Sequence, residues 1–234
     1  MNNYCVYCQD YVGSWLPYRD GFISPVLEKL EVIGSDLINF YCPRCECFDR
    51  ERHLFLYFDA LSLWDKIIHA KVLHIAPELN LSKLIASKVR LYLKGDLQPQ
   101  DESIMHVDLT KTNFSDNQFD LVIANHVLEH IEKDKEALFE IFRILKPGGF
   151  AILQAPFSLL LPNALECRDL KDERLRNFLF GQEDHVRLYG MDYFERMRNV
   201  GFNVELIDHS KILNSIDSVK YGVNAQEPLI LAKK

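Results

Sequence analysis

The strongest constraint on the fold is an alternation of short apolar segments with amphipathic helical patterns, which begins at Lys71. Strands that alternate with helices in this way favour a doubly wound, mostly parallel sheet of the α/β class. Seven strands are expected, at 71–75, 89–93, 104–107, 119–124, 150–155, 203–208 and 228–232, with helices at 79–87, 133–145 and 191–199.

A sheet of this kind binds its ligands at the carboxyl ends of the strands, where the strand order reverses. The loops that follow the expected strands are therefore where chemistry is expected. These loops are 74–80, 95–98, 108–110, 125–130 and 156–160.

Four cysteines in two C-x2-C pairs define a separate N-terminal module, expected at 1–47 and resembling a zinc ribbon. Two such turns can supply the four thiolates of a tetrahedral zinc site, and four thiolates leave no open position for catalysis, so the zinc is expected to be structural. A redox pair or unrelated free thiols are the alternatives, and Cys47 is close enough in sequence to compete as a ligand. The expected ligands are Cys5, Cys8, Cys42 and Cys45.

Composition narrows the function classes. The chain has 234 residues, of which 48% are hydrophobic, and this excludes a disordered or fibrous protein. The net charge of −7 argues against nucleic-acid binding through a broad basic surface. No apolar run approaches the roughly 18 residues that span a bilayer, and the first residues lack the pattern of a signal peptide. We therefore expect a cytoplasmic protein without a membrane partner, in which a linking helix at 48–70 joins the module to a domain at 71–234.

Two segments of this domain resemble the class I S-adenosylmethionine-dependent methyltransferases. They are Ser115–Ile131, which contains FDLVIANHVLEHI, and Arg143–Gly149, which reads RILKPGG one helix later. Val72–Glu78 and Gly181–Gly190 further resemble a narrower group of bacterial methyltransferases with an N-terminal cysteine-pair module. The resemblance covers about residues 70–234. It implies a Rossmann-like sheet of seven strands whose last strand is antiparallel and inserts between the fifth and sixth.

The resemblance also implies S-adenosylmethionine as cofactor, but the first loop departs from the family pattern. The family places three glycines there, whereas this chain has Ala76, Glu78 and Asn80. Loss of glycine restricts positive φ and close backbone approach, so a different turn is expected, with the Glu78 carboxylate pairing with the cofactor's α-ammonium group. The cofactor contacts expected from this loop are His74, Ala76, Pro77 and Glu78.

Further cofactor contacts follow from the family positions of the next three loops. Asp96, with Leu97 beside it, is expected to accept hydrogen bonds from the ribose hydroxyls, and Asp108, with Leu109, to hold the adenine amino group. Both aspartates are also suited to simple turn or cap roles. Asn125 and His126 are expected at the methionine end of the cofactor.

Two groups are candidates for the methyl-transfer site. His126 is one, although His130 nearby belongs to a stretch that often only packs a helix. The other lies within Asp184–Tyr189, where His185 is expected to act as a general base oriented by Asp184, and Arg187 and Tyr189 to bind the substrate. The alternative for this second group is a salt-bridged helix start that anchors a lid.

The leading functional hypothesis is O-methylation of a small molecule, such as a sugar or glycan precursor. There are two alternatives. One is an RNA methyltransferase whose zinc module recognises the RNA, and the other is a non-catalytic methyltransferase-like scaffold. Residues 1–70 hold 6 basic and 10 acidic side chains, a net charge of −4, which argues against the RNA hypothesis. The sequence leaves the oligomeric state open.

Overall fold

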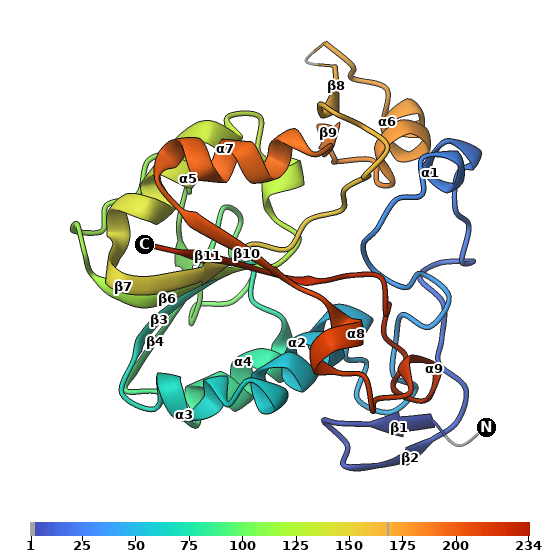
Figure 1. The fold of residues 1–234 in the computed structure, drawn as a ribbon, viewed down its shortest axis with the longest axis horizontal. Helices are drawn as coiled ribbons and strands as arrows, with labels where there is room; N and C mark the ends of the chain where they lie inside the picture. The colour runs from blue at the N-terminus through green and yellow to red at the C-terminus, as the bar shows by residue number, and fades with distance from the viewer. Residues whose placement is uncertain (1–2, 168) are drawn as a thin grey trace.

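Seven strands form the central sheet in the order β10–β11–β7–β6–β3–β4–β5 (Figure 1), as the computed structural model of residues 3–167 and 169–234 shows. Strand β11 is antiparallel to both of its neighbours, β7 and β10, and lies between them. The remaining pairs are parallel, so the fold class expected from the sequence is confirmed. The strands are β3 (Lys71–Ile75), β4 (Leu91–Asp96), β5 (Met105–His106), β6 (Phe119–Ala124), β7 (Leu145–Ile152), β10 (Asn203–Ile207) and β11 (Leu229–Lys233).

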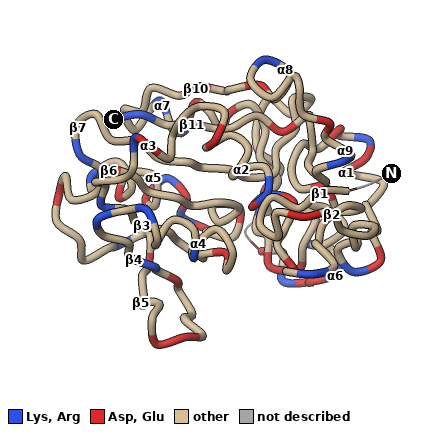
Figure 2. The backbone as a smooth tube through the Cα atoms, turned by 90° about the horizontal axis from the view of Figure 1, so that it is seen from below, with Lys and Arg blue, Asp and Glu red and all other residues tan. Residues whose placement is uncertain are grey.

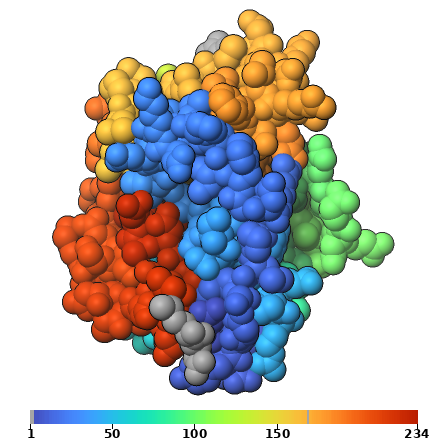
Figure 3. Space-filling model, turned by 90° about the vertical axis from the view of Figure 1, so that its right-hand side faces the viewer, coloured from blue at the N-terminus to red at the C-terminus, as the bar shows by residue number. Residues whose placement is uncertain are grey.

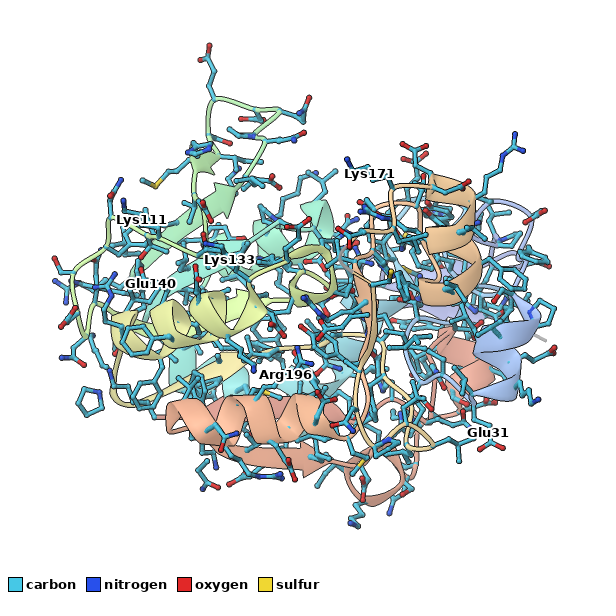
Figure 4. All side chains as sticks on the ribbon, turned by 90° about the horizontal axis from the view of Figure 1, so that it is seen from above. Glu31, Lys111, Lys133, Glu140, Lys171 and Arg196 are labelled. Carbon is cyan, nitrogen blue, oxygen red and sulfur yellow. The ribbon has the colours of Figure 1, made fainter. Side chains whose placement is uncertain are left out.

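Helices cover both faces of this sheet, as Figure 1 shows. Helices α5 (Asp134–Ile144) and α7 (Asp192–Val200) pack on one face, and α2 (Asp49–Ala60), α3 (Leu63–Ile67) and α4 (Leu79–Ala86) on the other. Apart from Asp120, strand β6 is apolar because it is buried on both sides: Val122 joins the first core, whereas Leu121 and Ile123 join the second. In Figure 4, Arg196 extends from α7 toward α5, where its guanidinium pairs with Asp134 at 2.7 Å.

The N-terminal module consists of the hairpin β1 (Asn3–Cys5) and β2 (Asp10–Val12) and the short helix α1 (Pro25–Lys29). Ser24 caps α1 as expected, since its side chain accepts a hydrogen bond from the Leu27 N–H. Figure 3 shows the N-terminal residues in blue between the orange segment that follows β7 and the red C-terminal segment. The module therefore lies against the sheet domain over a wide face.

A second small unit lies between β7 and α7. It contains the ribbon of β8 (Leu165–Glu166) and β9 (Arg187–Leu188) and the helix α6 (Glu173–Phe180), which contacts α1. The remaining short helices are η1 (Leu128–His130), α8 (His209–Ile212) and α9 (Ser218–Tyr221). Among residues 3–167 and 169–234, no helix is long and apolar enough to cross a membrane.

Several element boundaries differ from the sequence-based expectation. The linking helix is two helices, because Ser62 adopts a left-handed conformation with φ 51° between α2 and α3. Strand β4 is displaced toward its carboxyl end, so that Asp96 is its last residue. Strand β7 begins at Leu145 rather than Phe150: Leu145 pairs with Phe119, and Lys146–Gly149 bulge from the ladder before pairing resumes.

One buried arginine fixes the N-terminal module to the rest of the chain. Arg52 on α2 is fully buried, and its five N–H groups donate to five backbone carbonyls. Three of these carbonyls lie in the module and two at the C-terminal end of α9. The guanidinium also stacks on Trp15, 4.1 Å from the ring centroid. The five acceptors are the carbonyl oxygens of Asn39, Phe40, Cys47, Tyr221 and Gly222.

We expect Arg52→Met to lower the free energy of unfolding by about 3 kcal/mol or more, because five buried carbonyls lose their donor. Urea denaturation followed by circular dichroism measures this loss. Arg90→Met, at an exposed arginine, is the matched control and should change stability by less than about 0.5 kcal/mol. Equal stabilities of the two variants would contradict the role given to Arg52.

Candidate functional site

A cavity of about 710 Å³ opens at the carboxyl ends of β3, β4, β5 and β6. This is the position at which a doubly wound sheet binds ligands, and the volume is typical of a small-molecule site. Each of the first four strand-end loops contributes a residue to its wall. These residues include Ala76, Asp96, Asp108 and His126.

In the first loop, Ala76 adopts the backbone conformation for which glycine is usually required. This residue adopts φ 46°, a conformation that glycine favours, and its N–H donates to the Gly95 carbonyl at 2.8 Å. Gly95 itself is needed here, because a Cβ at that position would lie 2.7 Å from the Val107 side chain. Alanine has the smallest side chain that carries a Cβ, so the turn forms at a cost of about 1–2 kcal/mol.

Two of the predicted cofactor residues in this loop are directed away from the cavity. His74 is fully buried and contacts Tyr92 Oη through Nδ1 and Glu78 through Nε2, both at 2.9 Å. The other Glu78 oxygen accepts a hydrogen bond from Asn125 at 2.7 Å and lies 3.3 Å from Arg50 Nε. The predicted pairing of Glu78 with the cofactor's ammonium group is therefore not supported: its carboxylate is already held by protein groups. Pro77, like His74, Glu78 and Asn125, is not among the residues that line the cavity.

The structure places the remaining predicted cofactor residues on the cavity wall. Asp96 ends β4 and lines the cavity, and its carboxylate accepts the Gln98 N–H at 2.8 Å through one oxygen. Asp108 accepts from both the N–H and the hydroxyl of Thr110, and these bonds lower the pKa of its carboxyl. Leu97 and Leu109 lie beside the two aspartates.

His126 lies between two buried carboxylates and faces both cavities at this end of the molecule. Its Nε2 is 3.2 Å from Glu227 and its Nδ1 is 3.5 Å from Glu129. Burial alone lowers the pKa of His126, but the charges of Glu129 and Glu227 and the hydrogen bond to Glu227 outweigh this effect and raise it to about 9. The imidazole is therefore protonated near neutral pH, which suits it to donate hydrogen bonds rather than to accept a proton.

The second predicted catalytic group is not arranged as expected. Asp184 pairs with His130 at 3.1 Å, not with His185. His185 is buried, its Nδ1 lies 2.7 Å from the Phe180 carbonyl, and burial lowers the pKa of its imidazole. The dyad predicted from sequence adjacency does not form, because the backbone directs the two side chains into different environments.

Arg187 and Tyr189, predicted to bind substrate, serve the fold instead. Arg187 is buried, donates to the carbonyls of Leu128, Ile131 and Glu132, and pairs with Glu166 at 3.0 Å. Tyr189 is fully buried, and its hydroxyl donates to the Leu128 carbonyl or to Asp134. Neither side chain lines the two main cavities.

The N-terminal module and the start of α2 supply a wall of the first cavity that the sequence-based analysis missed. Tyr18, Phe40, Tyr41, Phe48 and Arg50 line it. Phe40 stacks on Phe48 with ring centroids 5.2 Å apart, and the Arg50 guanidinium lies 5.0 Å from the Phe48 ring centroid. The only signal in the sequence was the placement of aromatic residues on both sides of the second cysteine pair.

A second cavity, of about 630 Å³, lies between the module and the segment that follows β7. Leu27, Ile33, Phe180 and His185 contribute to its walls, and Glu31, labelled near α1 in Figure 4, is at its edge. His126, Phe40 and Gln182 line both cavities. The two cavities are thus neighbours that share a wall.

Four cysteines of the module converge as the sequence predicts. One sulfur from each of Cys5, Cys8, Cys42 and Cys45 lies within 4.8 Å of the others. The Cys5–Cys45 and Cys8–Cys42 sulfur pairs are 3.7 and 3.8 Å apart. Zn–S bonds of about 2.3 Å in a tetrahedron require sulfurs about 3.8 Å apart, so the residues fit a zinc ion. Cys47 is not part of this group of four, although its sulfur lies 3.6 Å from the Cys5 sulfur and 3.6 Å from an Arg52 nitrogen.

Comparisons with known proteins agree with this geometry. Residues 69–153 match the family model described as a methyltransferase domain. A search of curated proteins finds no significant match. Among solved structures, a chain from the complex between the Haloferax volcanii Trm112 methyltransferase activator and a methyltransferase shares 17% identity and a TM-score of 0.50, over 79% of this chain and 91% of that chain. An S-adenosylmethionine-dependent methyltransferase from Mesorhizobium loti shares 12% identity and a TM-score of 0.50, over 76% and 95%. Residues 69–153 are thus similar to a methyltransferase domain, and the chain shares its fold with solved S-adenosylmethionine-dependent methyltransferases.

The buried Glu78 carboxylate should stabilise the fold in a pH-dependent manner. Burial alone raises its pKa, but the hydrogen bond to His74 and the charge of Arg50 lower it to about 2, below its usual value of 4.5. Its contribution to stability is therefore complete above pH 4.5 and is lost as the pH falls toward 2.

We expect Glu78→Gln to reduce the free energy of unfolding by about 2 kcal/mol or more at pH 7, and by clearly less at pH 3. Urea titrations at the two pH values measure the difference, with the exposed Glu195→Gln as control. A loss of the same size at both pH values would show that the Glu78 charge is not the stabilising factor.

Proposed function

We propose that this protein transfers a methyl group from S-adenosylmethionine to a hydroxyl group of a small polar acceptor, such as a sugar or glycan precursor. The observation that carries the proposal is the pair of adjacent cavities, about 710 and 630 Å³, that share His126. One cavity lies where the class I fold binds its cofactor, and the other is open for an acceptor of similar size.

The first cavity suits the cofactor in a defined orientation. Asp96 at the end of β4 would accept hydrogen bonds from the two ribose hydroxyls, and Asp108 with Leu109 would hold the adenine. The methionine end would then extend toward Ala76 and His126. The aromatic wall of Phe40, Tyr41 and Phe48 would cover the cofactor from the side of the N-terminal module, which gives the module a role in cofactor binding.

Methyl transfer needs positioning more than it needs reactive side chains. In the displacement, the bond from the methyl carbon to the sulfonium sulfur breaks and a bond from that carbon to the acceptor oxygen forms. The sulfur becomes a neutral thioether, and the hydroxyl proton passes to solvent, because His126 is already protonated. Holding the two reactants in attack geometry is worth roughly 7–11 kcal/mol. His126, at the wall shared by the two cavities, is placed to orient the reacting groups with its N–H donors.

The charge distribution favours a small acceptor over RNA. Residues 1–70 carry a net charge of −4, and Figure 2 shows Lys and Arg interspersed with Asp and Glu along the tube rather than gathered in one stripe. A nucleic-acid reader depends on a basic surface that neutralises phosphates. The acidic module is better suited to covering a small-molecule site.

We expect Asp96→Ala to weaken S-adenosylmethionine binding at least 10-fold, because two hydrogen bonds to a charged acceptor are lost. Isothermal titration calorimetry with S-adenosylmethionine and S-adenosylhomocysteine measures this change. Asp101→Ala, at an exposed position that does not line either cavity, is the matched control. Saturable binding near one cofactor per chain supports the proposal, whereas no binding by the wild type would favour a non-catalytic scaffold.

We further propose that Cys5, Cys8, Cys42 and Cys45 hold one structural zinc ion. The spacing of the four sulfurs supports it. Zinc would fix the hairpin β1–β2 against the Phe40–Phe48 segment, and so hold the aromatic wall in place.

Elemental analysis should find about one zinc ion per chain, and Cys42→Ser should lower both the zinc content and the melting temperature. Cys167→Ser, at an exposed cysteine, is the control and should change neither. Protein that retains its melting temperature after complete removal of metal by a chelator would contradict a structural zinc site.

A further inference from the structure

A second cluster of ligand-type side chains lies outside the cysteine module, at the wall between the two cavities. Glu129 and His130 come from η1, and His185 comes from the turn before β9. One ligand atom from each of the three lies within 4.8 Å of the others. The rings of His130 and His185 meet edge to face, with centroids 4.6 Å apart.

Glu129 is the least satisfied member of this cluster. The residue is 1% exposed, and neither of its carboxylate oxygens accepts a hydrogen bond from any residue in the described part of the chain. Its nearest polar neighbours are His126 Nδ1 at 3.5 Å and His185 Nε2 at 3.9 Å. Because a buried carboxylate without hydrogen bonds is costly, this arrangement calls for an additional positively charged partner.

The tautomer of His185 also favours a positively charged partner at this position. Its Nδ1 lies 2.7 Å from the Phe180 carbonyl, and a carbonyl can only accept, so Nδ1 carries the hydrogen. In the neutral ring, Nε2 then has a lone pair, and Nε2 is buried without a hydrogen-bond partner among the described residues. The lone pair faces the Glu129 carboxylate, so two electron-rich atoms oppose each other at 3.9 Å.

The geometry of His130 completes a ligand set. Its Nδ1 pairs with the Asp184 carboxylate at 3.1 Å. A carboxylate on one ring nitrogen is the arrangement that orients metal-binding imidazoles through the other nitrogen. The backbone carbonyl of Phe180 serves the same purpose for His185.

We propose that Glu129, His130 and His185 bind one divalent first-row transition-metal ion. Bonds of about 2.0–2.2 Å from a metal to nitrogen and oxygen allow ligand atoms up to about 4 Å apart, and the distance of 3.9 Å between Glu129 and His185 falls within this limit. Two imidazoles and one carboxylate suit ions such as zinc, iron, cobalt and manganese, and leave coordination positions for a ligand.

The position of this ion gives it a role that rests on the proposed function. His130 lines the first cavity and His185 the second, so the ion lies where donor and acceptor would meet. An ion there would hold an oxygen of the acceptor and lower the pKa of its hydroxyl group, which assists loss of the proton during O-methylation.

Titration with Mn²⁺ of protein that carries one zinc ion per chain, so that only the cysteine cluster is filled, tests the site without turnover when it is followed by electron paramagnetic resonance. Mn²⁺ prefers oxygen and nitrogen ligands over thiolates, so it does not report on the cysteine cluster. We expect one saturable site per chain. Glu129→Gln and His130→Asn should each weaken binding at least 10-fold, whereas His69→Asn, at an exposed histidine, should not.

No saturable Mn²⁺ binding by the wild-type protein, or unchanged binding by the His130→Asn variant, would overturn the proposal. The His130 variant is decisive if Glu129→Gln does not fold, because His130 is partly exposed and tolerates substitution more readily. Calorimetry with S-adenosylmethionine on the same samples separates the two proposals. Cofactor binding without Mn²⁺ binding contradicts only the metal site, and Mn²⁺ binding without cofactor binding contradicts only the methyltransferase proposal.

Discussion

The Arg52 guanidinium, buried among five backbone carbonyls, is the interaction on which the rest of the site depends. A buried cation of this kind is tolerated only when every donor is satisfied, and here the acceptors come from two distant parts of the chain. The N-terminal module is thereby fixed against the C-terminal loop. Because the module forms walls of both cavities, the geometry of Arg52 also sets the shape of the site.

Two buried networks of charge extend this arrangement along the carboxyl edge of the sheet. In the first, Glu78 joins the first strand loop, through His74, to Asn125 in the fourth. In the second, His126 lies between Glu129 and Glu227, so it connects the fourth loop to the segment before β11. Low dielectric strengthens such contacts and makes them costly to break, so both loops are held rigidly beside the cavities. A rigid edge of this kind is what positional catalysis of methyl transfer requires.

The sheet and the cysteine cluster were predictable because both depend on local sequence pattern. Strand-like apolar segments alternate with helices. Each C-x2-C turn places its own two cysteine sulfurs close together, because only two residues separate them. Asp96 and Asp108 lie on the cavity wall, since strand ends fix where their loops begin, and their contacts with the cofactor stay a prediction.

The roles of His185, Arg187 and Glu78 depended on tertiary contacts that no local pattern encodes. Arg187 and Tyr189 form part of a dense polar cluster, but their partners are carbonyls and carboxylates near η1 and α5, more than fifty residues away. Glu78 is adjacent to the cofactor loop, yet it is directed inward because His74 and Asn125 hold it. The aromatic wall from Tyr18 to Phe48 was missed for the same reason, since it exists only once the module has docked on the sheet.

The central claim is that the cavity between the N-terminal module and the strand ends holds S-adenosylmethionine. A crystal structure of the protein with S-adenosylhomocysteine tests it most directly. The account predicts the ribose beside Asp96, the adenine beside Asp108 and the sulfur close to His126 at the wall between the two cavities. A cofactor bound elsewhere, or one that leaves the aromatic wall of the module without contact, would contradict it.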